Sequence, residues 1–171
     1  GTIALTGAFL LDSHQMLLVK STRESGAASM SLEERVEQLR IATWRQITDP
    51  EYLTKTYFKT VPRSIAPLDE YTEKVSVTAW PDEAAAAPLV VEKRKNAAAT
   101  VITDGAGLSN QRLAKVTVHI AWSGSNDRER TRELASIISN GGISRVNLPS
   151  MGNASGAPPT DTVDMPDATT P

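Results

Sequence analysis

The chain has 171 residues, of which 40% are hydrophobic, and it carries a formal net charge of −2 and no cysteine. This length is enough for one domain with appendages, and the lack of cysteine excludes disulfides, cysteine-based metal sites and thiol catalysis. When Asp161, Asp164 and Asp167 are set aside, 17 acidic residues face 18 basic ones. A nearly neutral domain does not have the basic footprint of a nucleic-acid-binding protein, so no nucleic-acid partner is predicted.

The N-terminus is apolar. Residues 1–11 carry no charge, and after a short polar stretch the apolar run resumes at residues 16–19. A helix that crosses a bilayer needs about 20 apolar residues, so residues 1–11 are too short to cross a membrane alone. We expect them to be the far end of a membrane-embedded segment that begins before Gly1. A domain attached to such a helix is typical of proteins that assemble rather than catalyse a reaction.

Residues 2–47 are predicted to be helical, with a kink near Gly26. Glycine destabilises a helix by roughly 1 kcal/mol relative to alanine, and Ser31 and Glu34 just beyond it have the spacing of a capping box. The helix is expected to end before Pro50, because the residue that precedes a proline is pushed out of the α region.

The second half of this helix has one apolar face. Residues at helical spacing form the face, with the tryptophan just beside it: Leu32, Val36, Leu39 and Trp44. Acidic residues come early in this half and basic residues come late, which suits the helix dipole. We therefore expect this face to pack on the rest of the domain.

Residues 50–72 are predicted to be a connecting region, and β-strands are predicted after it. Four segments have strand-like composition: 73–80, 88–93, 98–103 and 115–123. The last alternates most clearly, with Val116, Val118, Ile120 and Trp122 on one face. Asp104–Gly107 has the composition of a turn.

Residues 128–138 allow two interpretations. Local propensity favours a helix, since the large aliphatic side chains of the segment share a helical face. A strand that returns beside 115–123 would instead complete a hairpin. Asn140-Gly141-Gly142 ends either element.

The composition changes after Pro149. Proline, threonine, serine, alanine, glycine and aspartate dominate, and only Met151, Val163 and Met165 are sizeable apolar residues. Such a segment buries too little apolar surface to offset the entropy of ordering it. We expect it to be held by a neighbouring subunit.

This order of elements resembles that of type IV pilin-like proteins, a family that includes minor pilins and the pseudopilins of type II secretion. Residues 1–47 resemble the second half of the pilin membrane helix and its soluble extension. Residues 114–142 are similar to the terminal hairpin of minor pilins, with an alternating strand, a polar turn and an arginine-rich return. The cleavage-site glycine of the family, the Phe or Met after it and the glutamate that follows would lie before Gly1. The C-terminal disulfide of many pilins is impossible here.

The resemblance implies an α+β fold. A long N-terminal helix, residues 1–47, would pack on a small antiparallel sheet within a globular domain of residues 48–148. An irregular tail, residues 149–171, would follow. The resemblance also favours a strand at residues 128–139.

The resemblance further implies a structural function and not an enzymatic one. The protein would be a subunit of a membrane-rooted pilus or pseudopilus, located in the bacterial inner membrane and periplasm or in a cell-surface filament. Its partners would be copies of itself, other pilin-like subunits and the inner membrane, with no cofactor. Assembly would bury apolar side chains of the N-terminal helix: Ile3, Leu5, Phe9, Leu10, Met16 and Leu17.

The alternative is a binding module in the periplasm or outside the cell, either membrane-anchored or secreted. In that case residues 1–20 would be only the remainder of an anchor, and no filament would form.

Few polar residues are candidates for catalysis or metal binding. Asp12, Ser13 and His14 are adjacent, and adjacent helical side chains do not face each other. His119 is the only other histidine, and a zinc site would need carboxylates at positions that nothing indicates. Asp104–Asn110 lacks the alternating oxygen ligands of a calcium loop and the lysine of a phosphate loop. No catalytic residue or metal ligand is therefore predicted.

Two further patterns have a structural interpretation. Trp44, Trp80 and Trp122 are predicted to pack between the helix and the sheet. Asn153-Ala154-Ser155 matches the acceptor pattern for N-glycosylation, but such short patterns recur by chance.

Overall fold

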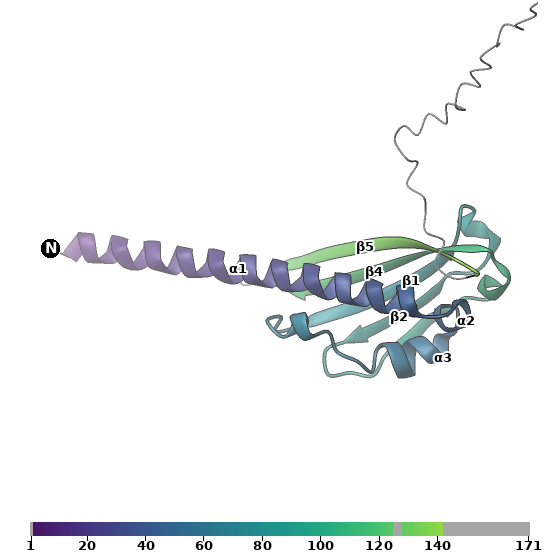
Figure 1. Ribbon diagram of the computed structural model, residues 1–171. Helices are drawn as coiled ribbons and strands as arrows, with labels where there is room; N and C mark the ends of the chain where they lie inside the picture. The colour runs from purple at the N-terminus through teal and green to yellow at the C-terminus, as the bar shows by residue number, and fades with distance from the viewer. Residues whose placement is uncertain (1, 125–127, 142–171) are drawn as a thin grey trace, which may run out of the picture.

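The structure is a computed structural model in which residues 2–124 and 128–141 are described, with side chains from residue 15 onward. A long helix, α1 (Thr2–Ile41), lies against one face of a five-stranded antiparallel sheet, and its N-terminal part extends well beyond the sheet (Figure 1). The predicted α+β class and the packing of a long helix on an antiparallel sheet are confirmed.

Helix α1 runs without a break through Gly26. Figure 1 shows no sharp bend along the helix, so the predicted kink is wrong. Ser31 does not start a new helix, because its Oγ donates to the carbonyl of Ala27, one turn back, at 2.8 Å. Packing of the neighbouring turns on the sheet outweighs the local cost of glycine, as is usual for helices in folded proteins.

The helix ends at Ile41 rather than at residue 47. Thr43 has an extended backbone and starts a separate helix, α2 (Trp44–Ile47). The Thr43 N–H donates to Gln46 Oε1 at 2.8 Å, and the Thr43 carbonyl accepts from Gln46 N at 3.0 Å. Thr43 and Gln46 have the capping-box spacing, and this box, rather than the one at Ser31, divides the helical region.

Residues 50–72 contribute to the core and do more than connect. Asp49 caps α3 (Pro50–Tyr52), and a π-helical turn (Leu53–Tyr57) and a 3₁₀ turn (Arg63–Ile65) follow. Several side chains of this segment are buried: Leu53, Tyr57, Phe58, Ile65 and Leu68.

The sheet contains the five predicted strands, with their ends shifted by a few residues at most. The strands are β1 (Tyr71–Ala79), β2 (Leu89–Arg94), β3 (Thr100–Asp104), β4 (Leu113–Ser123) and β5 (Glu129–Ser139). Their order is β3-β2-β1-β4-β5, and all neighbours are antiparallel. Residues 129–139 form a strand, as the resemblance implied and local propensity did not.

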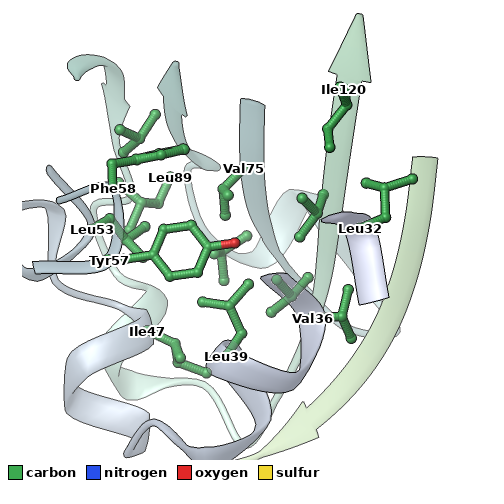
Figure 2. Packing of buried hydrophobic residues seen from close by; sticks show 14 of the residues in the cluster. Leu32, Val36, Leu39, Ile47, Leu53, Tyr57, Phe58, Val75, Leu89 and Ile120 are labelled. Atoms are coloured by element: carbon green, nitrogen blue, oxygen red, sulfur yellow. The ribbon is translucent and has the colours of Figure 1, made fainter. Parts of the chain in front are cut away.

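The core lies between α1 and the sheet. In β4 every second side chain is buried, from Ala114 to Trp122. Val118 pairs with Val75 of β1, so the apolar faces of the two strands are in register. Figure 2 shows Leu32, Val36 and Leu39 of α1 among the side chains of the sheet and of the 50–72 segment.

Candidate assembly surface

The C-terminal half of α1 is held on the sheet by one stripe of side chains. The buried residues recur at intervals of one and three, the pattern of a single helical face: Glu24, Ala27, Ala28, Ser31, Leu32, Arg35, Val36 and Leu39. The predicted apolar face of the helix is thus confirmed for its three aliphatic members. Trp44 lies on α2 instead and is half-buried.

The N-terminal half of α1 leaves the sheet (Figure 1). Met16, Leu17, Leu18 and Val19 are 67%, 40%, 68% and 68% exposed. Successive helical residues project about 100° apart, so these four make one turn of the helix, between Gln15 and Lys20, apolar on all sides. A helix that is apolar all round is normally buried. We call residues 2–20 the helix arm.

The six residues predicted to mediate assembly all belong to the helix arm. Met16 and Leu17 are exposed; the side chains of Ile3, Leu5, Phe9 and Leu10 lie outside the described part, although the backbone is helical there. With a rise of about 1.5 Å per residue, the six are spread over roughly 21 Å of one rod. Their role in assembly stays a prediction. Among the described residues, no helix is both long and apolar enough to cross a membrane.

Two arginines of β5 hold α1 close to where it leaves the sheet. Arg130 donates to Ser21 Oγ, and Arg132 donates to Ser25 Oγ at 2.7 Å. The two serines are one helical turn apart, and the two arginines lie on the same face of β5. The contacts therefore align the helix with the edge strand.

Glu24 is a buried carboxylate in the same region. Its Oε1 lies 3.8 Å from Lys20 Nζ, and its Oε2 has no hydrogen-bond partner among the described residues. Lys20 also lies 3.3 Å from Asp69 Oδ2. Both partners of the Lys20–Asp69 pair are exposed, and such pairs contribute about 1 kcal/mol or less to stability.

Under the helix, Arg35 and Glu73 form a fully buried ion pair. Arg35 Nε lies 2.7 Å from Glu73 Oε1 and Nη2 lies 2.9 Å from Oε2, and the two side chains are 0% and 1% exposed. The remaining guanidinium hydrogens go to the carbonyls of Tyr57 and Thr60, at 2.9 Å each, and to Gln38 Oε1 at 3.1 Å. All donors of the guanidinium thus find acceptors. We call this network the Arg35 clamp.

Two aromatic rings complete the Arg35 clamp. The guanidinium carbon lies 4.8 Å from the ring centre of Tyr57 and 5.4 Å from that of Phe58. The Tyr57 hydroxyl donates to the Arg35 carbonyl at 3.3 Å. Burial raises the pKa of Tyr57 far above its ordinary value; the charge of Arg35 opposes this shift, and that of Glu73 adds to it. The phenol therefore stays neutral, and the clamp joins α1, β1 and the 57–60 turn in one network.

The Arg35 clamp was not predicted, although the sequence contains a signal for it. Arg35 lies at helical spacing from Leu32 and Leu39, inside the buried stripe. Glu73 shares its strand parity with Val75 and is also buried. A search for charged residues in phase with apolar ones would have found both.

A second carboxylate fixes the loop beside the clamp. Glu34 Oε1 accepts from Ser64 Oγ at 2.6 Å, and Oε2 accepts from the Arg63 N–H at 3.0 Å. The Ser64 hydrogen bond lowers the pKa of Glu34, partial burial opposes this, and the backbone hydrogen bonds add to the lowering. Glu34 therefore links α1 to the loop before β1 and stays ionised at neutral pH.

His119 lies on the other face of the sheet and is half-buried. It pairs with Lys74 of β1 on one side and with Glu133 of β5 on the other. These residues, with Lys115 and Thr117, line part of a groove of about 340 Å³. In the described part of the chain, no three acidic or histidine side chains are grouped so that they could hold a metal ion. The side chains of Asp12, Ser13 and His14 lie outside that part.

The turn after β3 is confirmed. Asp104 Oδ1 accepts from the Ala106 N–H at 3.3 Å, and Gly105 and Gly107 have φ values of 71° and 86°. A Cβ atom on Gly105 would lie 2.6 Å from the Cβ of Leu89. The two glycines are thus explained by turn geometry.

The three tryptophans differ in how deeply they are buried. Trp122 is buried in the core, and Trp44 is half-buried, with Nε1 donating to the Ser109 carbonyl at 3.1 Å. Trp80 is 38% exposed, so its predicted core position is wrong. It follows Ala79, the last inward-facing residue of β1, and therefore points outward.

The acceptor pattern at Asn153, the tail 149–171 and the turn residues 125–127 lie outside the described residues. Comparison of the chain with family models, with curated proteins and with solved structures found no match.

Proposed function

We propose that this protein is a structural subunit of a membrane-rooted, pilin-like filament, a pilus or a pseudopilus. It would assemble with copies of itself or with other pilin-like subunits at the bacterial inner membrane or in a cell-surface filament. One observation carries the proposal: a single helix is fixed to the sheet along its C-terminal half and exposes four successive apolar residues, Met16 to Val19, where it has left the sheet. The resemblance of the order of elements to pilins supports it.

The helix arm is suited to packing beside equivalent arms. Burying a large aliphatic side chain contributes roughly 1.5–3 kcal/mol, and Met16 to Val19 provide four in succession. Because the arm continues a helix that the sheet already orders, less conformational entropy is lost on association. Side-by-side packing of arms would leave each domain on the outside of the bundle.

The direct test is assembly of the full chain after removal of detergent, followed by light scattering and electron microscopy. Wild type is expected to form elongated assemblies, and Met16→Glu combined with Leu17→Glu is expected to prevent them. Ile41→Glu is the matched control, because Ile41 is 75% exposed at the other end of α1. Assembly that survives the double substitution would contradict the assigned surface.

A second test uses the native protein. Its mass and N-terminal sequence, taken from a membrane or sheared-filament fraction, should show further apolar residues before Gly1, starting with a methylated Phe or Met. A mature chain that starts at Gly1 would contradict the membrane-rooted helix.

A binding module is the second candidate, and the groove on the outer face of the sheet favours it. Lys74, His119 and Glu133 present both charges and an imidazole around about 340 Å³ of open volume. Under this candidate the helix arm is an anchor only. The full chain would then remain monomeric in detergent and would form no filament when the detergent is removed.

A further inference from the structure

A groove lies at the β3 edge of the sheet, on the face that carries α1. Phe58, Val101 and the alanines 97–99 provide its apolar lining, and lysines line it as well. Its volume is about 440 Å³. It is separate from the helix arm and from the groove on the outer face.

The groove is positively charged. Lys55, Lys59 and Lys93 line it, and no aspartate or glutamate does. Lys59 is exposed and forms no ion pair with any described residue, while Lys93 donates to the Phe58 carbonyl. Lys55 pairs with Glu51 outside the lining. An adjoining hollow of about 300 Å³ adds another cation, Lys95.

We propose that the acidic C-terminal segment of the same chain, residues 161–167, docks in this groove. Its sequence is Asp161-Thr162-Val163-Asp164-Met165-Pro166-Asp167, which places three carboxylates around two apolar side chains. The chain contains no lysine or arginine after Arg145, so nothing in the segment repels the lysines. Its two apolar side chains match the apolar lining, and its carboxylates match the lysines.

The length of the chain allows this contact. Strand β5 ends at Ser139, four strands away from β3. With a strand spacing of about 4.8 Å, the sheet is roughly 20 Å wide between them. The distance along the strands is at most about nine residues, or roughly 30 Å. The twenty steps along the chain from Gly141 to Asp161 can span about 66 Å, so the segment can reach the groove of its own domain.

The composition of the tail led to the expectation that a neighbouring subunit holds it. The choice of the chain's own domain instead rests on effective concentration. A segment tethered by a linker of this length is present at an effective concentration near millimolar. A second, freely diffusing copy would have to reach that concentration to compete.

The lack of native cysteine makes a specific test possible. Thr162→Cys provides a single site for a nitroxide spin label in the full chain, held in a neutral detergent that covers the helix arm. Proximity of the label would reduce the amide NMR signals of residues 97–101 and of Lys59. Replacement of the three aspartates by asparagine, or Lys59→Gln, should restore these signals. Lys74→Gln, on the opposite face of the sheet, is the matched control and should leave the signal loss unchanged.

A mixture of differently labelled chains shows whether the segment in the groove comes from the same chain or from a second copy. In a sample that combines isotope-labelled chains without the nitroxide and unlabelled chains with it, the proposal expects no signal loss at the groove. Signal loss in the mixture would make a second copy the occupant and would overturn the assignment to the same chain. Absence of signal loss at residues 97–101 in the singly labelled chain would overturn docking altogether. Neither result depends on filament assembly, since the helix arm is not involved.

Discussion

Arg35 of α1 and Glu73 of β1 form a buried bidentate ion pair, with N–O distances of 2.7 and 2.9 Å. The pair fixes the helix to the central strand of the sheet, β1, which has two strands on either side. Both partners are buried, and each is the counter-ion of the other inside the domain. The first prediction follows from this pairing.

Glu73→Gln should destabilise the domain by about 3–5 kcal/mol, because it leaves the guanidinium of Arg35 buried without a counter-charge. Urea unfolding of a fragment that starts at Lys20, and so keeps every buried residue of the described part, measures the loss. Arg35→Met combined with Glu73→Leu should cost less than the single change, since no unpaired charge remains.

The matched control for the clamp is Arg40→Ala. Arg40 and Glu37 lie 3.4 Å apart at the surface, and such a pair is worth about 0.3–0.5 kcal/mol. If Glu73→Gln cost no more than Arg40→Ala, the clamp would not be a determinant of stability.

Gly26→Ala should stabilise the protein by about 0.5–1 kcal/mol, because the helix continues through this position and a Cβ atom would meet nothing within 4 Å. Thermal or urea unfolding of the fragment from Lys20 measures the gain. Gly105→Ala is the opposite case and should destabilise, since Gly105 has φ +71° and the new Cβ would contact Leu89. A loss of stability in Gly26→Ala would argue for a break in the helix.

Glu34 should make the fold sensitive to acid. Its pKa is lowered in the folded state, chiefly by the hydrogen bond from Ser64. Its contribution is therefore present above the ordinary pKa of 4.5 and is lost as the pH falls through the lowered folded value. The difference in unfolding free energy between wild type and Glu34→Gln should be larger at pH 7 than at pH 3. Glu33→Gln, at an exposed neighbouring position, should show no such change.

Tyr57 should make the fold sensitive to base. Burial raises its folded pKa above the ordinary value of 10.0, so the unfolded chain loses this proton first and stability falls as the pH rises above about 10. Tyr57→Phe should give a shallower fall between pH 9 and pH 11.5. Some slope should remain, because burial also raises the pKa of Tyr71. Equal slopes in the two proteins would contradict the assignment to Tyr57.

The strands were predictable because their signal is local. In β4, alternation from Val116 to Trp122 identifies the buried face without reference to other elements. Strand β5 is different, since its local sequence favours a helix and only pairing with β4, from Leu113 opposite Ser139 to Ser123 opposite Glu129, makes it extended. Long-range pairing of this kind overrides propensity and is invisible to a local pattern.

The errors in the helix and the missed clamp have one physical cause. By residue type alone, Gly26 indicates a helix breaker and Ser31 a cap, and nothing in the type of Arg35 indicates that it is buried. Packing on the sheet instead incorporates Ser31 and Arg35 into the buried stripe and carries the helix through Gly26. The exposed apolar residues of the helix arm were predicted from composition alone, because no tertiary contact overrides them.

Because α1 is one unbroken helix, a small rotation where it is fixed to the sheet becomes a large displacement at its N-terminal end. The part of the helix beyond its contact with Arg130 runs from Ser21 to Thr2 and is about 28 Å long at 1.5 Å per residue. A rotation of about two degrees at Ser21 therefore moves the tip by about 1 Å. Close-packed side chains tolerate only displacements that are much smaller than the width of a methyl group. A change of a few degrees in the angle between the helix and the sheet would therefore displace the tip of the helix by more than close packing permits. The contacts of Ser21 and Ser25 with β5, together with the buried stripe that contains Arg35, thus set how accurately the far end of the helix is positioned.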